Sequence, residues 1–297
     1  MQPHSTAIDP LALAAPDEDA HSGSRGFRRW LAPAFLAAWL VPLAAHAVGL
    51  EWLLPPLVLL ITAALLRGGR TLFDRLILAV TLLLGVAMAA GLLFSIWPWR
   101  LHPVPVTGLA LTALVVVSVA TGRRPALPRP AWTDAVPLLV TAALIRYLAT
   151  PYVGADLVRR VAVLGRGEDN FRHLALFDVV GRLGGYVFLD EPGARDHLLS
   201  QLVYYPQGWH LSAVLLDGFI VPPSTVPGGT GAMDHYISWT LAGFGLLVAA
   251  LLWAAQWLPG RCTRCIGWCW PWRSAPSCSV ASCRGCSVPA SPPRRWG

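Results

Sequence analysis

Seven long apolar runs divide this chain, and they restrict the folds open to it more than any other feature. A helix needs about 20 mostly apolar residues to cross a hydrocarbon core about 30 Å thick. The runs occupy residues 31–50, 52–66, 76–97, 104–121, 135–150, 211–221 and 237–258. Charged residues make up only 13% of the chain, about half the share that is usual in soluble domains. The sequence therefore predicts an all-α fold, a polytopic transmembrane helix bundle of about 6–7 spans.

Two of these runs are weaker than the others. The run 52–66 has 15 residues and contains Pro55 and Pro56, which a membrane helix tolerates when neighbouring groups bind the freed carbonyls. The run 211–221 is shorter still. It either spans the membrane together with upstream residues, or enters and leaves the membrane on the same side.

The formal net charge of +7 comes mostly from one end of the chain. All 23 residues counted as Lys+Arg are arginine, and the last 38 residues carry six of them and no acidic residue. Residues 1–259 therefore hold a net charge of only +1, which argues against nucleic acid as a partner. The expected partner is the lipid bilayer.

Changes in composition divide the chain into five parts. Residues 1–30 are polar and predict a disordered cytoplasmic tail. Residues 31–150 predict a bundle of five spans, and residues 151–210 an extracytoplasmic loop with an acidic motif. Two further membrane segments follow over 211–258, and residues 259–297 form a tail rich in Cys, Arg and Trp.

Arginines near the ends of the first spans predict the orientation. Positive residues in short loops are retained in the cytoplasm. With a cytoplasmic amino terminus, the outer short loops hold only Arg100, and the inner segments hold nine arginines. The nine are Arg25, Arg28, Arg29, Arg67, Arg70, Arg75, Arg123, Arg124 and Arg129. We therefore expect a multi-pass protein of the cell membrane with its amino terminus in the cytoplasm and the segment 151–200 outside.

The outer segment contains the pattern of an amphipathic helix. Apolar residues recur at helical spacing from about Asp169 to Leu183, with the apolar face expected on the membrane surface or on the bundle. Asp169 and His173 share a face, as do Glu168 and Arg172. A carboxylate beside an imidazole binds a divalent metal, or acts as a general base on an acceptor hydroxyl. In the alternative, Asp169 favours the positive helix end, Glu168 and Arg172 form a surface pair, and His173 is solvated.

A second cluster, Tyr204-Tyr-Pro-Gln-Gly-Trp-His210, comes directly before the weak sixth run. Aromatic residues with Pro and Gly are typical of interfacial anchors at the start of a helix. The functional alternative is a wall for a polar head group, formed by Tyr205, Gln207, Trp209 and His210. Asp217 lies seven residues after His210 on the same helical face, and an ionisable residue within a span indicates function.

Three stretches together resemble a pattern of actinobacterial polytopic membrane proteins. They are Glu168-Asp-Asn-Phe-Arg-His173, Gly184-Gly-Tyr186 and Tyr204-Tyr-Pro-Gln-Gly-Trp-His210. These proteins look like the GT-C class of membrane glycosyltransferases. In that class an acidic residue in an outer loop assists the transfer of a sugar from a polyprenyl-phosphate donor to an acceptor. The acidic loop of that class follows the first span, whereas five predicted spans precede it here.

The resemblance implies roles for individual residues. Asp169 is the first candidate for the acidic catalytic residue or for a ligand of a divalent metal, and Glu168 is the second. His173, Tyr205 and His210 would line the donor phosphate and sugar. The other expected substrate-binding residues are Arg172, Gln207, Trp209 and Asp217.

All six cysteines occur in the tail, between Cys262 and Cys286. Two C-x2-C pairs, Cys262 with Cys265 and Cys283 with Cys286, are separated by 17 residues, a spacing that matches a zinc site. We favour a shifted reading frame of GC-rich DNA, because the tail shows no helix or strand period and is enriched in Cys, Arg, Trp, Pro and Ser. In that interpretation the native protein continues with more spans. A disordered tail or outer disulfides are the remaining alternatives.

The resemblance thus implies a membrane glycosyltransferase, or a relative of one, that acts on a lipid-linked sugar in assembly of the cell envelope. The alternative is a non-catalytic membrane protein, such as a transporter subunit or a scaffold of an envelope complex. Motifs of other enzyme classes are missing. A phosphate-binding Gly-Lys-Ser/Thr loop cannot form without Lys, and neither G-x-S-x-G nor H-E-x-x-H occurs.

Overall fold

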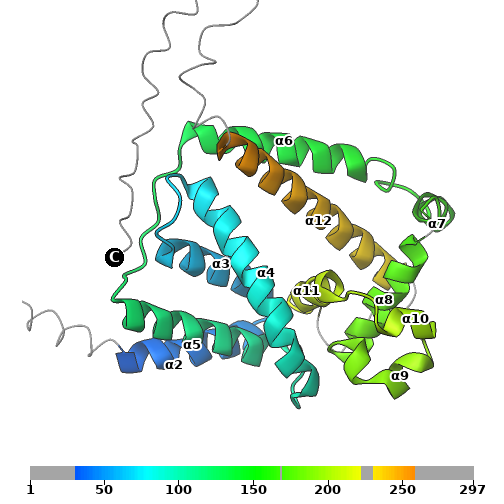
Figure 1. Cartoon of the computed structure of the whole chain (residues 1–297), viewed down its shortest axis with the longest axis horizontal. Coiled ribbons are helices and arrows are strands. Elements are labelled where there is room, and N and C mark those ends of the chain that lie inside the picture. The colour runs from blue at the N-terminus through cyan, green and yellow to red at the C-terminus, as the bar shows by residue number, and fades with distance from the viewer. Residues whose placement is uncertain (1–30, 168, 222–229, 258–297) are drawn as a thin grey trace, which may run out of the picture. The chain divides into compact units, whose positions relative to one another are not determined.

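The computed structural model describes residues 31–167, 169–221 and 230–257. The predicted tails 1–30 and 259–297, with the cysteine pairs, lie outside the described residues, as does Glu168. All regular structure in the described part is helical, as the sequence predicts (Figure 1). The side-chain contacts given below lie within the compact unit Met1–Ala254.

Four of the described helices are long and apolar enough to cross a membrane. They are α4 (Leu72–Ile96), α5 (Pro103–Thr121), α6 (Trp132–Ala149) and α12 (Thr230–Trp257). Each coincides with one of the strong apolar runs of the sequence. The chain is thus an all-helical membrane protein with four candidate membrane-spanning helices.

The other three apolar runs form shorter helices, so the predicted count of six or seven spans is not confirmed. Helix α2 (Leu31–Ala47) has 17 residues. Two prolines occupy the first turn of α3 (Leu54–Leu65), which has 12 residues and follows the 3-10 turn η2 (Glu51–Leu53). Helix α11 (Gly208–Asp217) has 10 residues and a length of about 15 Å, half the thickness of a hydrocarbon core.

Capping side chains and a glycine mark where the spanning helices begin and end. Thr71 and Asp74 form a capping box at the start of α4, in which each side chain accepts a hydrogen bond of 3.1 Å from the other's backbone N–H. At α6 the Asp134 carboxylate accepts a hydrogen bond of 2.9 Å from the N–H of Ala131. Gly122 follows the end of α5 with a φ of 63°, in the left-handed region that favours glycine. Both α4 and α6 therefore begin before the apolar runs that predicted them.

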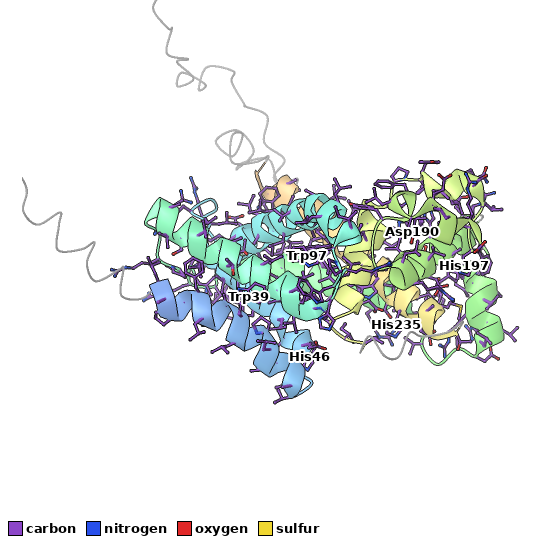
Figure 2. All side chains as sticks on the ribbon, turned by 90° about the horizontal axis from the view of Figure 1, so that it is seen from below. Trp39, His46, Trp97, Asp190, His197 and His235 are labelled. Carbon is purple, nitrogen blue, oxygen red and sulfur yellow. The ribbon has the colours of Figure 1, made fainter. Side chains whose placement is uncertain are left out.

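Helices α2, α3 and α5 pack together. Helix α2 contacts α5, and α3 contacts both α4 and α5 (Figure 1). Trp39 of α2 (Figure 2) lies so close to Gly108 of α5 that a Cβ atom at this glycine would be 2.8 Å from the indole ring. The missing side chain of Gly108 therefore permits the close approach of the two helices.

The segment after α6 folds into short helices around α11. They are α7 (Leu157–Leu164), α8 (Asn170–Leu183), η3 (Val187–Leu189), α9 (Glu191–Arg195) and α10 (Ser200–Val203). Helix α8 agrees with the helix predicted from Asp169 to Leu183. Its residues Leu176 and Val180 are fully buried in one cluster with Leu211 of α11. The apolar face of α8 thus packs on the protein, one of the two positions expected for it.

Helix α12 contacts distant parts of the fold near its two ends. Near its end, the indole N–H of Trp253 donates a hydrogen bond of 3.0 Å to the Asp74 carboxylate at the start of α4. Near its beginning, Met233 and Tyr236 are buried in a cluster with Phe177 of α8 and Ala213 of α11. Helices α8, α11 and the first half of α12 therefore form a common packing unit, and this unit carries the candidate site.

Candidate functional site

Two histidines and a tyrosine from the predicted site meet where α8 packs on α11. Nδ1 of His173 on α8 lies 3.2 Å from Nε2 of His210 on α11. The two imidazole rings stack with 12° between their planes and 5.2 Å between their centres. The ring of Tyr205 meets His173 edge-on at 5.2 Å. We call these three residues the histidine–tyrosine cluster.

Gln207 fixes the backbone that presents this cluster. Its side-chain carbonyl accepts a hydrogen bond of 2.7 Å from the N–H of Val187, and its amide donates one of 2.6 Å to the carbonyl of Val203. Gln207 is only 3% exposed, so these bonds are shielded from water. Both ends of the Gln207 amide thus hold neighbouring backbone, which gives this residue a structural role; its predicted ligand-binding role stays a prediction. The bonds position the loop from α10 to α11, which contains Tyr205.

The environment of His210 makes its imidazole neutral over a wide pH range. His210 is 5% exposed. Burial, with a smaller contribution from His173, lowers the pKa of His210 to about 4. Its Nδ1 is buried and has no hydrogen-bond partner among the described residues.

The unpartnered Nδ1 atom determines how the proton is placed on the neutral ring. A proton on Nδ1 would bury an N–H group without an acceptor, whereas a proton on Nε2 is donated to Nδ1 of His173. We infer the second tautomer. His173 then accepts at Nδ1, and a neutral His173 carries its own N–H on Nε2, the atom that remains for a ligand.

Asp169 and His173 do not form the carboxylate–imidazole pair that their spacing predicts. Asp169 Oδ1 instead accepts a hydrogen bond of 2.9 Å from the guanidinium of Arg172, and both side chains are more than half exposed. Glu168 lies outside the described residues, so its pairing with Arg172 stays a prediction. In the described part of the chain, no three His, Cys, Asp or Glu side chains group closely enough to hold a metal ion. The described residues around Asp169 therefore form no such group, and the neighbouring Glu168 is not among them.

A carboxylate–imidazole pair does occur, between α11 and α12. His235 donates a hydrogen bond of 2.6 Å from Nδ1 to Asp217 Oδ1, and the indole of Trp239 donates one of 2.7 Å to the same oxygen. Asp217 is largely shielded, with 13% of its side chain exposed. The sequence prediction identified Asp217 but neither of its partners.

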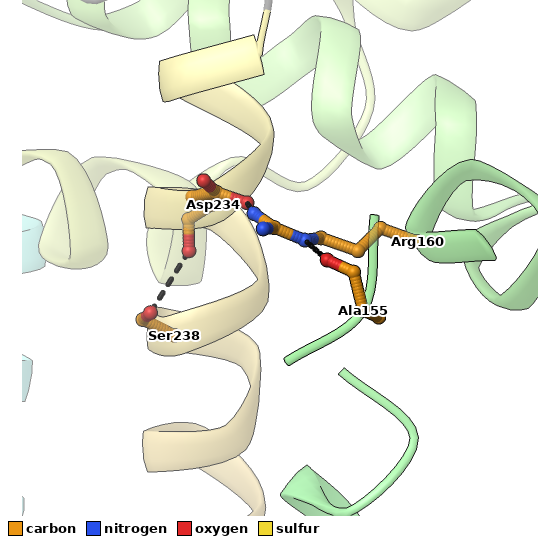
Figure 3. Close-up of polar contacts among 4 residues, drawn as sticks. All are labelled: Ala155, Arg160, Asp234 and Ser238. Carbon is orange, nitrogen blue, oxygen red and sulfur yellow. Dashed lines mark hydrogen bonds and ion pairs between the residues drawn. The ribbon is translucent and has the colours of Figure 1, made fainter. Parts of the chain in front are cut away.

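A second ionic contact joins α7 to α12 (Figure 3). On α12 it involves Asp234, the residue directly before His235. Arg160 donates from Nη1 to Asp234 at 2.6 Å and from Nε to the carbonyl of Ala155 at 2.8 Å. The hydroxyl of Ser238 donates to the backbone carbonyl of Asp234 at 2.8 Å. Sequence reasoning missed Asp234 and His235 because the apolar run of α12 begins only at Ile237. The signal that would have found them is the spacing of Asp234 with Ser238 and of His235 with Trp239, one helical turn each.

Trp209, the remaining residue predicted for substrate binding, packs between helices. A Cβ atom at Gly243 of α12 would lie 2.6 Å from its indole ring. Trp209 is half-buried and belongs to the cluster of Phe177 and Ala213. This contact supports the packing of α11 on α12. The predicted residues thus fall into an exposed or half-buried group, Asp169, Arg172, His173 and Tyr205, and a group that is buried or packed between helices, Gln207, Trp209, His210 and Asp217.

Comparisons of this chain with protein-family profiles, curated proteins and solved structures find no match. The exposed or half-buried group combines a carboxylate, a guanidinium, an imidazole and a phenol. Such a set suits recognition of an anionic, hydroxyl-rich ligand: guanidinium and imidazole N–H groups bind phosphate, and an aromatic ring stacks on a sugar.

Proposed function

We propose that this protein is a membrane glycosyltransferase that moves a sugar from a polyprenyl-phosphate donor to a hydroxyl acceptor at the outer face of the cell membrane. The GT-C-like motifs of the sequence motivate the proposal. The observation that best supports it is the contact of His173 with Tyr205 and His210. The fold brings these residues together although His173 and His210 are 37 residues apart in the sequence. A cytoplasmic amino terminus, inferred from the arginine distribution, belongs to the same proposal.

In the proposed reaction, the acceptor hydroxyl oxygen attacks the anomeric carbon of the sugar. The bond from that carbon to the phosphate oxygen breaks, and the polyprenyl phosphate leaves with the electron pair. The Asp169 carboxylate takes the proton of the acceptor hydroxyl. The Nε2–H of His173 donates to the leaving phosphate, while the Tyr205 ring stacks on the sugar.

The exposed ion pair of Asp169 and Arg172 is compatible with these roles. Surface ion pairs contribute only about 0–1 kcal/mol. A substrate phosphate therefore draws the guanidinium of Arg172 away from Asp169 at little cost in free energy. Displacement leaves the Asp169 carboxylate open to the acceptor hydroxyl. The same movement gives the phosphate a positively charged partner in addition to the Nε2–H group of His173.

Replacing Asp169 tests the proposal, and α8 itself provides the control. Asp178 also forms an ion pair with an arginine one turn later on the same helix, Arg182, at 2.8 Å. Membranes containing the protein are incubated with radiolabelled polyprenyl-phosphate sugars, and labelled product is counted. We expect Asp169→Asn to lower transfer about 100-fold or more and Asp178→Asn to leave it within about twofold. Equal transfer by the two variants would remove Asp169 from the mechanism.

The second candidate is a non-catalytic membrane protein, a transporter subunit or a scaffold of an envelope complex. The observation that favours it is that the best-defined ionisable groups join helices: Asp217 to His235 and Arg160 to Asp234. Groups used in this way stabilise a bundle without a reaction. If no donor sugar is transferred by the unmodified protein, and Asp217→Ala separates it from copurifying membrane proteins, this second candidate replaces the first.

A further inference from the structure

An apolar groove runs between α2, α3 and α5, away from the histidine–tyrosine cluster. Its volume is about 440 Å³, within the range of about 300–1,000 Å³ that is typical of pockets for small organic ligands. Ala34 and Ala38 line it from α2, Ile61 from α3, and Leu111 and Leu114 from α5. Among the described residues of the lining, Ser118 is the only polar one, and its hydroxyl donates a hydrogen bond of 2.6 Å to the carbonyl of Arg123. The groove therefore provides apolar contacts for a hydrocarbon chain and almost no hydrogen-bonding groups for a polar molecule.

The loop that follows α5 borders one end of the groove, which we call its mouth. Pro125 lines the groove, and the next residue, Ala126, donates a backbone hydrogen bond of 3.0 Å to Ala64 of α3. The guanidinium of Arg75 on α4 donates one of 2.7 Å to the carbonyl of Ala126. These bonds fix the loop against α3 and α4. Arg123 and Arg124 immediately precede Pro125, so two arginines belong to the anchored backbone at the mouth of the groove.

Three exposed arginines lie close in sequence to groove residues at this mouth. Arg123 and Arg124 are exposed, and so is Arg67, which follows the groove residue Leu65 by two positions. None of the ion pairs of the described residues involves these three arginines. The acid nearest in sequence to Arg67 is Asp74, which already accepts hydrogen bonds from two backbone N–H groups and from an indole. The acid nearest in sequence to Arg123 and Arg124 is Asp134, whose carboxylate accepts a hydrogen bond from the N–H of Ala131. The mouth therefore complements an anion.

We propose that this groove binds an anionic phospholipid, with one acyl chain between α2, α3 and α5 and the phosphate at Arg123 and Arg124. Within a bilayer, an acyl chain gains no hydrophobic free energy by moving from other lipids into the groove. Selection among lipids therefore depends on the head group, where basic residues at a membrane surface attract negative charge. This site is independent of the proposed glycosyl transfer.

The test measures lipid selectivity of the purified full-length protein by native mass spectrometry. Dioleoyl phosphatidylglycerol and dioleoyl phosphatidylcholine, which share the same acyl chains, are added at equal concentration. We expect the anionic lipid to be retained about tenfold more than the zwitterionic one, and the double variant Arg123→Ala, Arg124→Ala to reduce this ratio to about one. The matched control is Arg159→Ala with Arg166→Ala, which removes the same charge from exposed positions elsewhere and is expected to keep the preference.

A second variant tests the position of the acyl chain. Ala34→Phe adds a ring to the groove lining and leaves every arginine in place. We expect it to reduce retention of both lipids several-fold. Unchanged retention by Ala34→Phe would overturn the groove as the site, and equal loss in the two double-arginine variants would overturn Arg123 and Arg124 as the head-group contact. Displacement of the lipid by millimolar inorganic phosphate alone would show that a free anion, and not a lipid, is the ligand.

Discussion

Acidification is expected to destabilise this protein through one buried histidine, His210. Burial and the neighbouring His173 lower the pKa of His210 to about 4 in the folded protein, while the ordinary value near 6.5 applies once the chain unfolds. Because the folded pKa is the lower one, the unfolded state binds the proton more readily. The stability associated with the neutral ring is fully present above about pH 6.5 and is lost as the pH falls toward 4.

The size of the effect follows from the two pKa values of His210. A difference of about 2.5 between them corresponds to about 3 kcal/mol when the pH lies well below both. At about pH 5 the unfolded state is almost fully protonated and the folded state is still mostly neutral, so about 2 kcal/mol is lost. With a total stability of only about 5–15 kcal/mol for a typical protein, such a loss is measurable.

The assay is the free energy of unfolding in detergent, followed by tryptophan fluorescence at about pH 7.5 and pH 5. His197 is exposed and serves as the control position. We expect the unmodified protein and His197→Gln to lose about 2 kcal/mol more on acidification than His210→Gln. Equal losses in all three proteins would refute the inference that His210 is buried in its neutral form.

Two further substitutions test packing and the support of the cluster by the same unfolding measurement. Gly108→Ala should cost about 1–3 kcal/mol because the new Cβ would lie 2.8 Å from the Trp39 ring, whereas Gly85→Ala in α4 meets no atom within 4 Å and should gain about 1 kcal/mol. Equal effects of the two glycine substitutions would contradict the packing of α2 on α5. Gln207→Leu should cost about 1–3 kcal/mol because it leaves the buried N–H of Val187 without an acceptor, and an unchanged stability would exclude the structural role of Gln207.

Apolar length predicted the four long helices, but it placed several of their ends wrongly. Helix α12 begins at Thr230, seven residues before the apolar run that predicted it. The residues in between include Asp234 and His235, which a hydropathy pattern assigns to a loop. They are helical here, and their side chains bind Arg160 and Asp217 on neighbouring helices. A hydropathy pattern read within one segment does not reveal partners that lie on other helices.

The weak sixth run shows why apolar composition alone does not identify a span. Leu211, Ala213 and Leu215 are each less than 9% exposed, and they pack on α8 and on other parts of the protein. A helix buried in protein and a helix in lipid select the same residue types, and length distinguishes them. The 10 residues of α11 agree with the first case.

The site was predictable to the extent that it depends on local spacing. Helical periodicity predicted α8, and the resemblance to GT-C enzymes brought His173, Tyr205 and His210 into one hypothesis. The same spacing paired Asp169 with His173, yet the imidazole of His173 binds His210, and near this site the carboxylate of Asp217 binds the imidazole of His235. Spacing along one helix determines which side chains share a face.

Which of those side chains bind each other depends on the helix that packs against that face. On α8 the packing partner is α11, so His173 meets the ring of His210 while Asp169 at the exposed end retains only Arg172. This division has a chemical consequence for the proposed reaction. The carboxylate remains accessible to an acceptor from the water side, and the imidazole is oriented by a neutral, buried neighbour that holds its Nδ1. The proposed base, Asp169, and the residue proposed to donate a hydrogen bond to the phosphate, His173, thus differ in environment although they lie one helical turn apart.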